Sequence, residues 1–152
     1  MELPQALREA IETQILEHEP AQAAVVLRDA VNALGAEEVA GGLLDAAAGA
    51  LRLMVAETDE ALDQVELLDR LALDGAVPEE NIDLLGRLLT FAASTAGGIR
   101  PPVDRVVGEL GAERALFGAW LTTLSAIRVV AISLERTEAD VAEDVLRVVD
   151  AF

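Results

Sequence analysis

Four charged residues stand alone inside otherwise apolar stretches, and they are the first candidates for chemistry. They are Asp45 and Arg52 in residues 40–56, Arg87 in residues 84–99 and Arg128 in residues 115–134. A buried charge without a partner costs several kcal/mol, so each must reach solvent, an ion-pair partner or a ligand. Two interpretations stay open. The four residues are either exposed or paired structural charges, or they form an anion-binding pocket between helices.

Carboxylates recur at spacings of three and four residues, which brings several acids to one face of a helix. Helical enzymes hold magnesium over a phosphate with acids arranged in this way. Such sets occur at Asp59, Asp63 and Glu66 and at Asp140, Glu143 and Asp144. The sequence contains no Cys, a single His and no Gly-rich phosphate loop. We therefore predict no catalytic residue, no metal site and no cofactor, and keep magnesium-dependent hydrolysis as an alternative.

The segment VVGELGAERA (residues 106–115) resembles a helix of the MazG-like nucleotide pyrophosphohydrolases. In that family a Glu-x-x-Glu pair and a later Glu-x-x-Asp pair hold the metal. Glu109 matches the second Glu of the first pair, but Val106 stands at the position of the first Glu. The last predicted helix also lacks a Glu-x-x-Asp pair. The resemblance implies a magnesium-dependent helical nucleotide hydrolase.

The elements that must position these groups are helices, and the most apolar one is predicted over residues 112–135. This stretch contains the only Trp of the chain, Trp120. A helix that is apolar on nearly every side belongs inside a bundle or inside a membrane. We predict a central helix of a soluble bundle, with Trp120, Leu124, Ile127 and Leu134 facing other helices.

Apolar periodicity interrupted by Gly and Pro predicts helices along the rest of the chain. Helices are expected to end at Gly35 and Gly111, and to begin at Pro20 and behind a Thr58 cap. The predicted fold is an all-α single domain over residues 1–152, a bundle of six long helices plus one short helix around the central helix. The alternative is a HEAT-like array of helical hairpins, because helix pairs begin at intervals of roughly 40 residues. No residue-level similarity accompanies that interval.

One predicted helix, starting near Ala36, is rich in small residues. Gly42, Ala46, Gly49 and Ala50 share one of its faces. Gly inside a helix costs up to about 1 kcal/mol relative to Ala, so close approach of another helix is the simplest explanation. The central helix carries a similar face, and the two faces could match each other within one chain. Because 53% of the residues are hydrophobic, we instead predict a leftover apolar surface and a homodimer through this face.

The chain is strongly acidic, with a net charge of −17 over 152 residues, and its cations are all Arg. A nucleic-acid partner is excluded because its phosphates would be repelled. High-salt solubility or a basic protein partner fits the charge. Residues 57–83 contain ten acids and one Arg, a net charge of −9, and are predicted to form a solvated face.

The predicted location is the cytoplasm. The start of the chain, MELPQALREAIE, is acidic where a signal peptide requires basic residues and an apolar run. The stretch 115–134 is long enough to span a bilayer, but Arg128 near its middle costs about 2.5–3.5 kcal/mol on insertion scales. We predict no membrane association.

Taken together, these features favour a small acidic helical module for protein–protein interaction or an accessory role, without catalysis. The alternatives are a ligand-sensing bundle with an Arg-lined pocket and the magnesium-dependent hydrolase. A sensor requires Arg52, Arg87 or Arg128 in the wall of a closed pocket, and an enzyme requires three or more convergent acids. An interaction module requires an exposed apolar surface.

Overall fold

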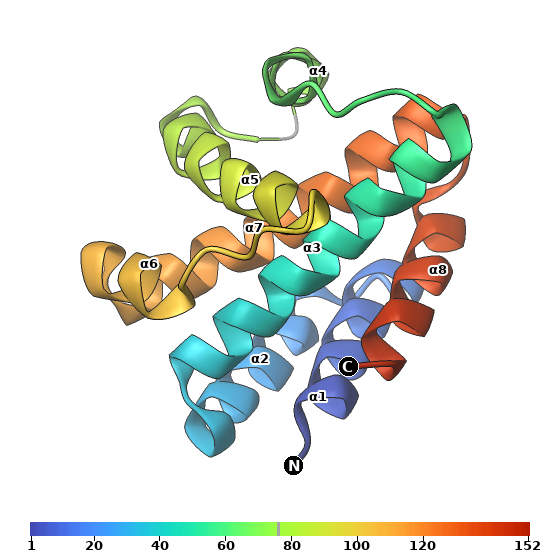
Figure 1. Cartoon of the computed structure of the whole chain (residues 1–152). Helices are drawn as coiled ribbons and strands as arrows, with labels where there is room; N and C mark the ends of the chain where they lie inside the picture. The colour runs from blue at the N-terminus through green and yellow to red at the C-terminus, as the bar shows by residue number, and fades with distance from the viewer. Residues whose placement is uncertain (76) are drawn as a thin grey trace.

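The computed structural model describes residues 1–75 and 77–152, and every regular element among them is helical (Figure 1). The protein therefore belongs to the all-α class, as predicted. A π-helical turn, η1 (Glu12–Leu16), extends the first helix, and a 3₁₀ turn, η2 (Glu79–Asn81), precedes the fifth. The eight α-helices in the described residues are α1 (Leu3–Ile11), α2 (Pro20–Leu34), α3 (Ala36–Thr58), α4 (Gln64–Asp74), α5 (Ile82–Ala96), α6 (Val103–Leu110), α7 (Ala112–Leu134) and α8 (Glu138–Asp150).

The predicted number of helices agrees with the described residues, since six long helices and one short one around the central helix make eight. The predicted Thr58 cap is absent. Helix α3 continues through Thr58, whose hydroxyl donates to the Met54 carbonyl at 2.8 Å. Helix α4 begins later, where the Asp63 carboxylate accepts hydrogen bonds from two backbone N–H groups.

The second half of the chain repeats the order of the first. In each half the first helical segment is followed, two residues later, by a residue with positive φ: His18 (57°) or Gly98 (99°). A Pro-containing turn then leads to a second helix. A single glycine, Gly35 (φ 91°) or Gly111 (φ 86°), joins it to a third helix of 23 residues. Both of these long helices end at an acidic residue in the left-handed conformation, and a capped fourth helix follows.

Over the second and third helices of each half, residues 20–58 and 96–134, residue identities accompany this repeat at an offset of 76 positions. The identical pairs in these ranges are Val31/Val107, Leu34/Leu110, Gly35/Gly111, Ala36/Ala112, Glu37/Glu113, Gly42/Gly118, Ala50/Ala126 and Arg52/Arg128. Gly42 and Gly118 also share a role. A Cβ on Gly42 would meet two leucines of α1 at 2.9 and 3.0 Å, and a Cβ on Gly118 would meet two leucines of α5. The interval of roughly 40 residues considered from the sequence is therefore about half of the true repeat.

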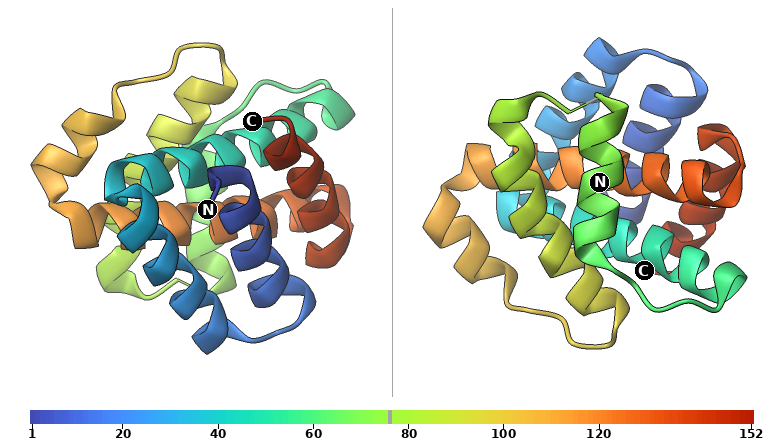
Figure 2. Two further views of the ribbon diagram at one scale, coloured as in Figure 1. Left: turned by 90° about the horizontal axis from the view of Figure 1, so that it is seen from below. Right: turned by 90° about the horizontal axis from the view of Figure 1, so that it is seen from above.

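The two halves pack against each other reciprocally (Figures 1 and 2). Helix α4 lies on α5, the first helix of the second half, and α8 lies on α1, the first helix of the first half. Arg8 of α1 binds Asp150 of α8, and this hydrogen bond lowers the pKa of Asp150. Buried residues of both halves form one continuous core. Contacts between elements this distant in sequence differ from a HEAT array, in which each repeat touches only its neighbours.

Helix α7 has the central position predicted for it, and it packs along α3 over much of its length. The Thr123 hydroxyl of α7 donates to the Leu43 carbonyl of α3 at 2.8 Å, which requires a close approach of the two backbones. Of the four α7 residues predicted to face other helices, all pack against the core, but only Ile127 is fully buried. Trp120, Leu124 and Leu134 are half-buried, because one side of α7 stays partly uncovered.

The close packing of α5 on α7 predicts that Gly118→Ala destabilises the protein by about 1–3 kcal/mol. A methyl group there would overlap Leu88 and lie 3.1 Å from Leu84, so α5 has to move. The matched control is Gly108→Ala in α6, where a Cβ meets nothing within 4 Å. This control should stabilise by up to about 1 kcal/mol. Urea denaturation measures both changes, and equal stabilities of the two variants would contradict the α5–α7 contact.

Candidate functional site

A hollow with a volume of about 600 Å³ lies along the uncovered side of α7. We call it the α7 groove. Two of its apolar residues, Leu121 and Leu124, come from α7, and both are half-buried. Ile15 from η1, Val77 from the segment after α4 and Ala139 from α8 complete the apolar lining. The groove thus gathers residues from both halves of the chain.

The side of the groove formed by η1 results from an irregular helix end. The N–H of Glu17 donates to the Glu12 carbonyl at 3.0 Å, a bond that spans five residues and widens the turn. The N–H of Glu19 then bonds the Thr13 carbonyl at 2.9 Å, and His18 takes a left-handed conformation. Gln14, Ile15 and His18 consequently line the groove. No sequence pattern indicated this turn.

Arg128 is the one cation of Arg or Lys type that lines the groove in the described structure, and it is held by acids from two other helices. Its Nε donates to the Asp74 carboxylate at the end of α4, and its Nη1 lies 3.8 Å from a Glu138 oxygen of α8. The hydrogen bond with Asp74 raises the pKa of Arg128. The guanidinium therefore joins α7 to the end of α4 and to α8 at the groove. Two carboxylates offset its positive charge.

Polar contacts attach helix α4 to α7. It crosses above α7 in the right-hand view of Figure 2. Besides the contact between Asp74 and Arg128, Arg70 of α4 donates to the Ser133 hydroxyl of α7 at 2.6 Å. Only Leu67 and Leu71 of α4 are buried, whereas Leu73 is 89% exposed. This helix belongs to the acidic segment predicted to be solvated, and its outer face is exposed.

Five acidic residues lie close in the chain to residues that line the groove. Each of them is exposed and makes no ion pair with any described residue. They are Glu17 and Glu19 beside His18, Glu79 and Glu80 after Val77, and Glu135 before Thr137. We call these five residues the acidic rim. The groove therefore combines apolar residues with polar ones, Gln14, His18, Ser125 and Thr137 among them, and acids lie near it in the chain.

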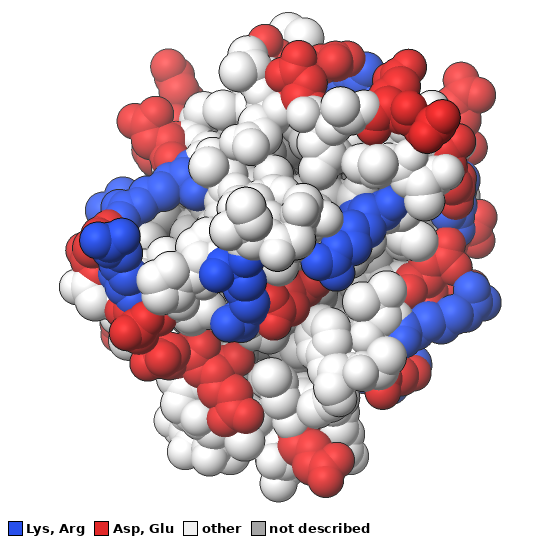
Figure 3. Space-filling model, viewed as in Figure 1, with Lys and Arg blue, Asp and Glu red and all other residues white. Residues whose placement is uncertain are grey.

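The four charges proposed from the sequence as an anion pocket do not come together as a set. Asp45 and Arg52 line a smaller hollow of about 260 Å³ with Arg100 and Phe152, while Arg128 lies in the α7 groove. Arg87 pairs with Glu109 of α6. Figure 3 shows several Arg side chains on the face that carries α3, α5 and α6, with acids beside them.

Within the smaller hollow, both cations already have acceptors from the chain. Arg52 donates to the Thr95 and Ala96 carbonyls at 2.7 and 3.3 Å, so it caps the end of α5. Arg100 binds both oxygens of Asp45 at 2.9 and 3.1 Å, and this hydrogen bonding raises the pKa of Arg100. These contacts agree with the first interpretation of the sequence, in which the lone charges are paired for structural reasons. A role of these residues toward a ligand stays a prediction.

The small-residue face proposed as a dimer interface is covered by the chain itself. Gly42, Ala46, Gly49 and Ala50 are all buried. A Cβ on Gly49 would lie 2.9 Å from Val148 of α8, and α1 covers Gly42 in the same way. The close helix approach inferred from these residues is therefore present, but it is intramolecular. A second copy of the chain cannot reach this face, and a homodimer stays a prediction without this interface.

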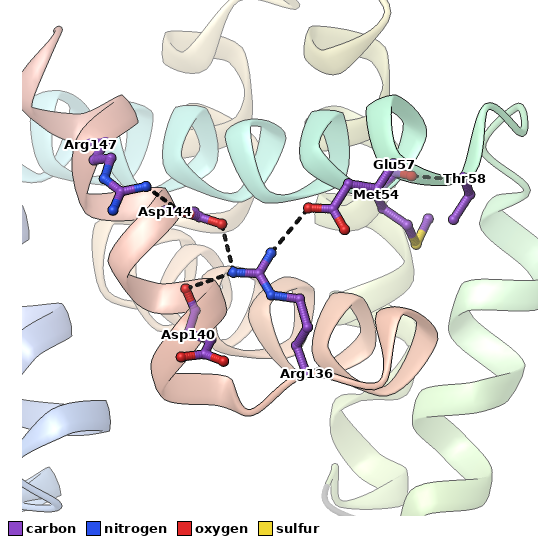
Figure 4. Close-up of polar contacts among 7 residues, drawn as sticks. All are labelled: Met54, Glu57, Thr58, Arg136, Asp140, Asp144 and Arg147. Atoms are coloured by element: carbon purple, nitrogen blue, oxygen red, sulfur yellow. Dashed lines mark hydrogen bonds and ion pairs between the residues drawn. The ribbon is translucent and has the colours of Figure 1, made fainter.

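One polar cluster was missed by the sequence reasoning. Arg136, in the turn between α7 and α8, binds Glu57 of α3 at 3.2 Å and Asp144 of α8 at 2.7 Å (Figure 4). It also donates to the Asp140 carbonyl at 3.1 Å, and Asp144 accepts from Arg147. These hydrogen bonds raise the pKa of Arg136, with Asp144 as the main cause. The cluster joins the end of α3 to α8 and is a structural clasp.

Helices α3 and α7 are both long and apolar enough to cross a membrane by length and composition alone. Their most apolar windows are 72% and 61% buried inside the protein, as core helices also are. Among residues 1–75 and 77–152, no three His, Asp or Glu side chains gather into a group that could hold a metal ion. The acids spaced for one helix face thus do not converge with others in the described structure.

The attachment of α4 predicts a local effect of Arg128→Gln. Loss of the contact with Asp74 should speed amide hydrogen exchange in α4 by roughly 1.5- to 5-fold, because exposed ion pairs contribute little. Helices α3 and α7 should keep their protection. The control is Arg147→Gln, which removes an exposed Arg on α8 and should leave exchange in α4 unchanged. Unchanged α4 exchange in both variants would show that the contact does not hold this helix.

Function has to be argued from these sites, since a fold class alone does not define a function. The described structure presents the α7 groove with acids near it in the chain, the Arg136 cluster, and a hollow whose two arginines already have acceptors. No protein-family model matches the chain, and no match to it was found among the curated proteins or the solved structures.

Proposed function

We propose that this protein is a non-catalytic module for protein–protein interaction and that the α7 groove is its binding surface. The observation that carries the proposal is the open groove of about 600 Å³ beside the most apolar helix of the chain. The groove brings the half-buried Leu121 and Leu124 of α7 together with Ile15, Val77 and Ala139 from other segments. An apolar surface of this kind that stays open to solvent marks an interaction site.

The exposed apolar side chains of α7 extend beyond the groove in a regular pattern. Phe117 and Ile132 are 49% and 47% exposed. Together with Leu121 and Leu124 they recur at helical spacing along one face, interrupted only by Arg128. An apolar stripe on a soluble protein with a net charge of −17 favours a partner that covers it. The location of the protein in the cytoplasm is part of the same proposal.

The other functions considered from the sequence have less support. A ligand sensor needs arginines with free donors in a closed pocket, whereas Arg52 and Arg100 are engaged with Thr95, Ala96 and Asp45. The magnesium-dependent hydrolase would need convergent acids, and none gather as a group in the described residues. A homodimer is compatible with the proposal only if a second copy covers the α7 groove.

The proposal is tested by photo-crosslinking in the protein's own cells. A benzoylphenylalanine placed at Leu124 should form a covalent adduct with one defined polypeptide, identified by mass spectrometry together with the crosslinked peptide. The matched control carries the same group at Leu73, which is 89% exposed and does not line the groove. Leu121→Glu in the Leu124 protein should abolish the adduct. Identical adducts from both positions, or none from Leu124, would contradict the proposed function.

A further inference from the structure

We infer that the segment occupying the α7 groove is an amphipathic helix of a basic protein, with apolar residues in the groove and Lys or Arg toward the acidic rim. This inference rests on the proposed function and adds the chemical class of the partner. Three features of the groove support it: the geometry of its walls, the spacing of its apolar residues and the sign of the charges around it.

The walls favour a helical occupant over an extended one. An extended peptide binds by adding a strand to the edge of a sheet, which supplies hydrogen bonds to its backbone. The described part of this protein has no strand, and the groove is bordered by η1, α7 and the start of α8. A helix satisfies its own backbone hydrogen bonds and needs only apolar contacts from the groove.

The apolar residues of the groove match the side-chain spacing of a helix. Leu121 and Leu124 lie three positions apart on α7 and form neighbouring contacts along it. Ile15 and Ala139 add apolar surface from two other elements. A docked helix with large apolar residues at positions i, i+3 and i+7 can place them along this line, as helices bound in grooves do.

The charges around the groove select a cationic partner. The five acids of the acidic rim are exposed, and they make no ion pair within the described structure. Arg128 does not offset them, because Asp74 and Glu138 already neutralise it. A cleft bordered by charges of one sign attracts a partner of opposite sign and repels a like-charged one.

The test uses a phage-displayed library of 18-residue helical peptides. Leu is fixed at positions i, i+3 and i+7, and the flanking positions are free to be Lys or Glu. A second library has the same composition but shuffled Leu positions, so it reports attraction by charge alone. We expect the full-length protein to enrich Lys-rich peptides at least tenfold more from the first library than from the second.

Two pairs of charge-reversal variants then locate the selection. Glu17→Arg with Glu19→Arg changes two exposed rim residues and should reduce the Lys preference at least fivefold. Glu37→Arg with Glu38→Arg reverses two exposed acids at the start of α3 and should leave the preference unchanged. Leu124→Glu should abolish the advantage of the correctly spaced library, with a thermal melt confirming that this variant is folded.

Each remaining outcome overturns the inference. The inference is wrong if the protein enriches no peptides, or enriches them without preferring Lys. It is also wrong if the advantage of the correctly spaced library persists in Leu124→Glu, or if the rim variants leave the Lys preference unchanged. The proposed function is judged separately by the Leu124 crosslink. An adduct at Leu124 without Lys selection removes the basic helix and keeps the interaction module. A second copy of this chain as the crosslinked partner would do the same.

Discussion

The contact between α3 and α7 is the interaction on which the rest of the structure depends. The two 23-residue helices approach closely because small residues face their neighbours, and the Thr123 hydroxyl reaches the Leu43 carbonyl across the contact. Many weak dispersion contacts accumulate at such short distances. The first helix of each half then packs over a glycine of its own long helix, Gly42 in one half and Gly118 in the other. Removing these glycines would separate the layers that form the core.

The surroundings of the two central helices differ, and one side of α7 stays partly uncovered. Helix α3 is surrounded by α1, α5, α6, α7 and α8, and most of its residues are buried. Helix α7 is covered less completely, since α4 touches it through Arg70 and Asp74 and η1 leaves a gap beside Leu121 and Leu124. Two helices of equal length and similar composition thus have different surroundings. The groove lies where α7 is covered less completely than α3.

The sequence predicted the elements better than their arrangement. Helix ends at Gly35 and Gly111 and the start at Pro20 follow from local backbone preferences, and they are correct. The Thr58 cap was wrong because the hydroxyl found a carbonyl acceptor one turn earlier within the helix. The small-residue face correctly indicated a close approach, but helical spacing does not say which helix approaches. The π-helical turn beside His18 depends on long-range packing, so no local pattern indicated it.

A protein built as two similar halves in one chain differs from an assembly of two identical chains. In a symmetric dimer every substitution occurs twice, so both equivalent surfaces must change together. Within a single chain, each half accumulates its own substitutions. Here Leu121 and Leu124 stand where the first half has Asp45 and Ala48, although Arg52 and Arg128 are still identical. The fused arrangement is pseudosymmetric in fold and asymmetric on its surface, so the surface of one half can change while its counterpart stays as it is.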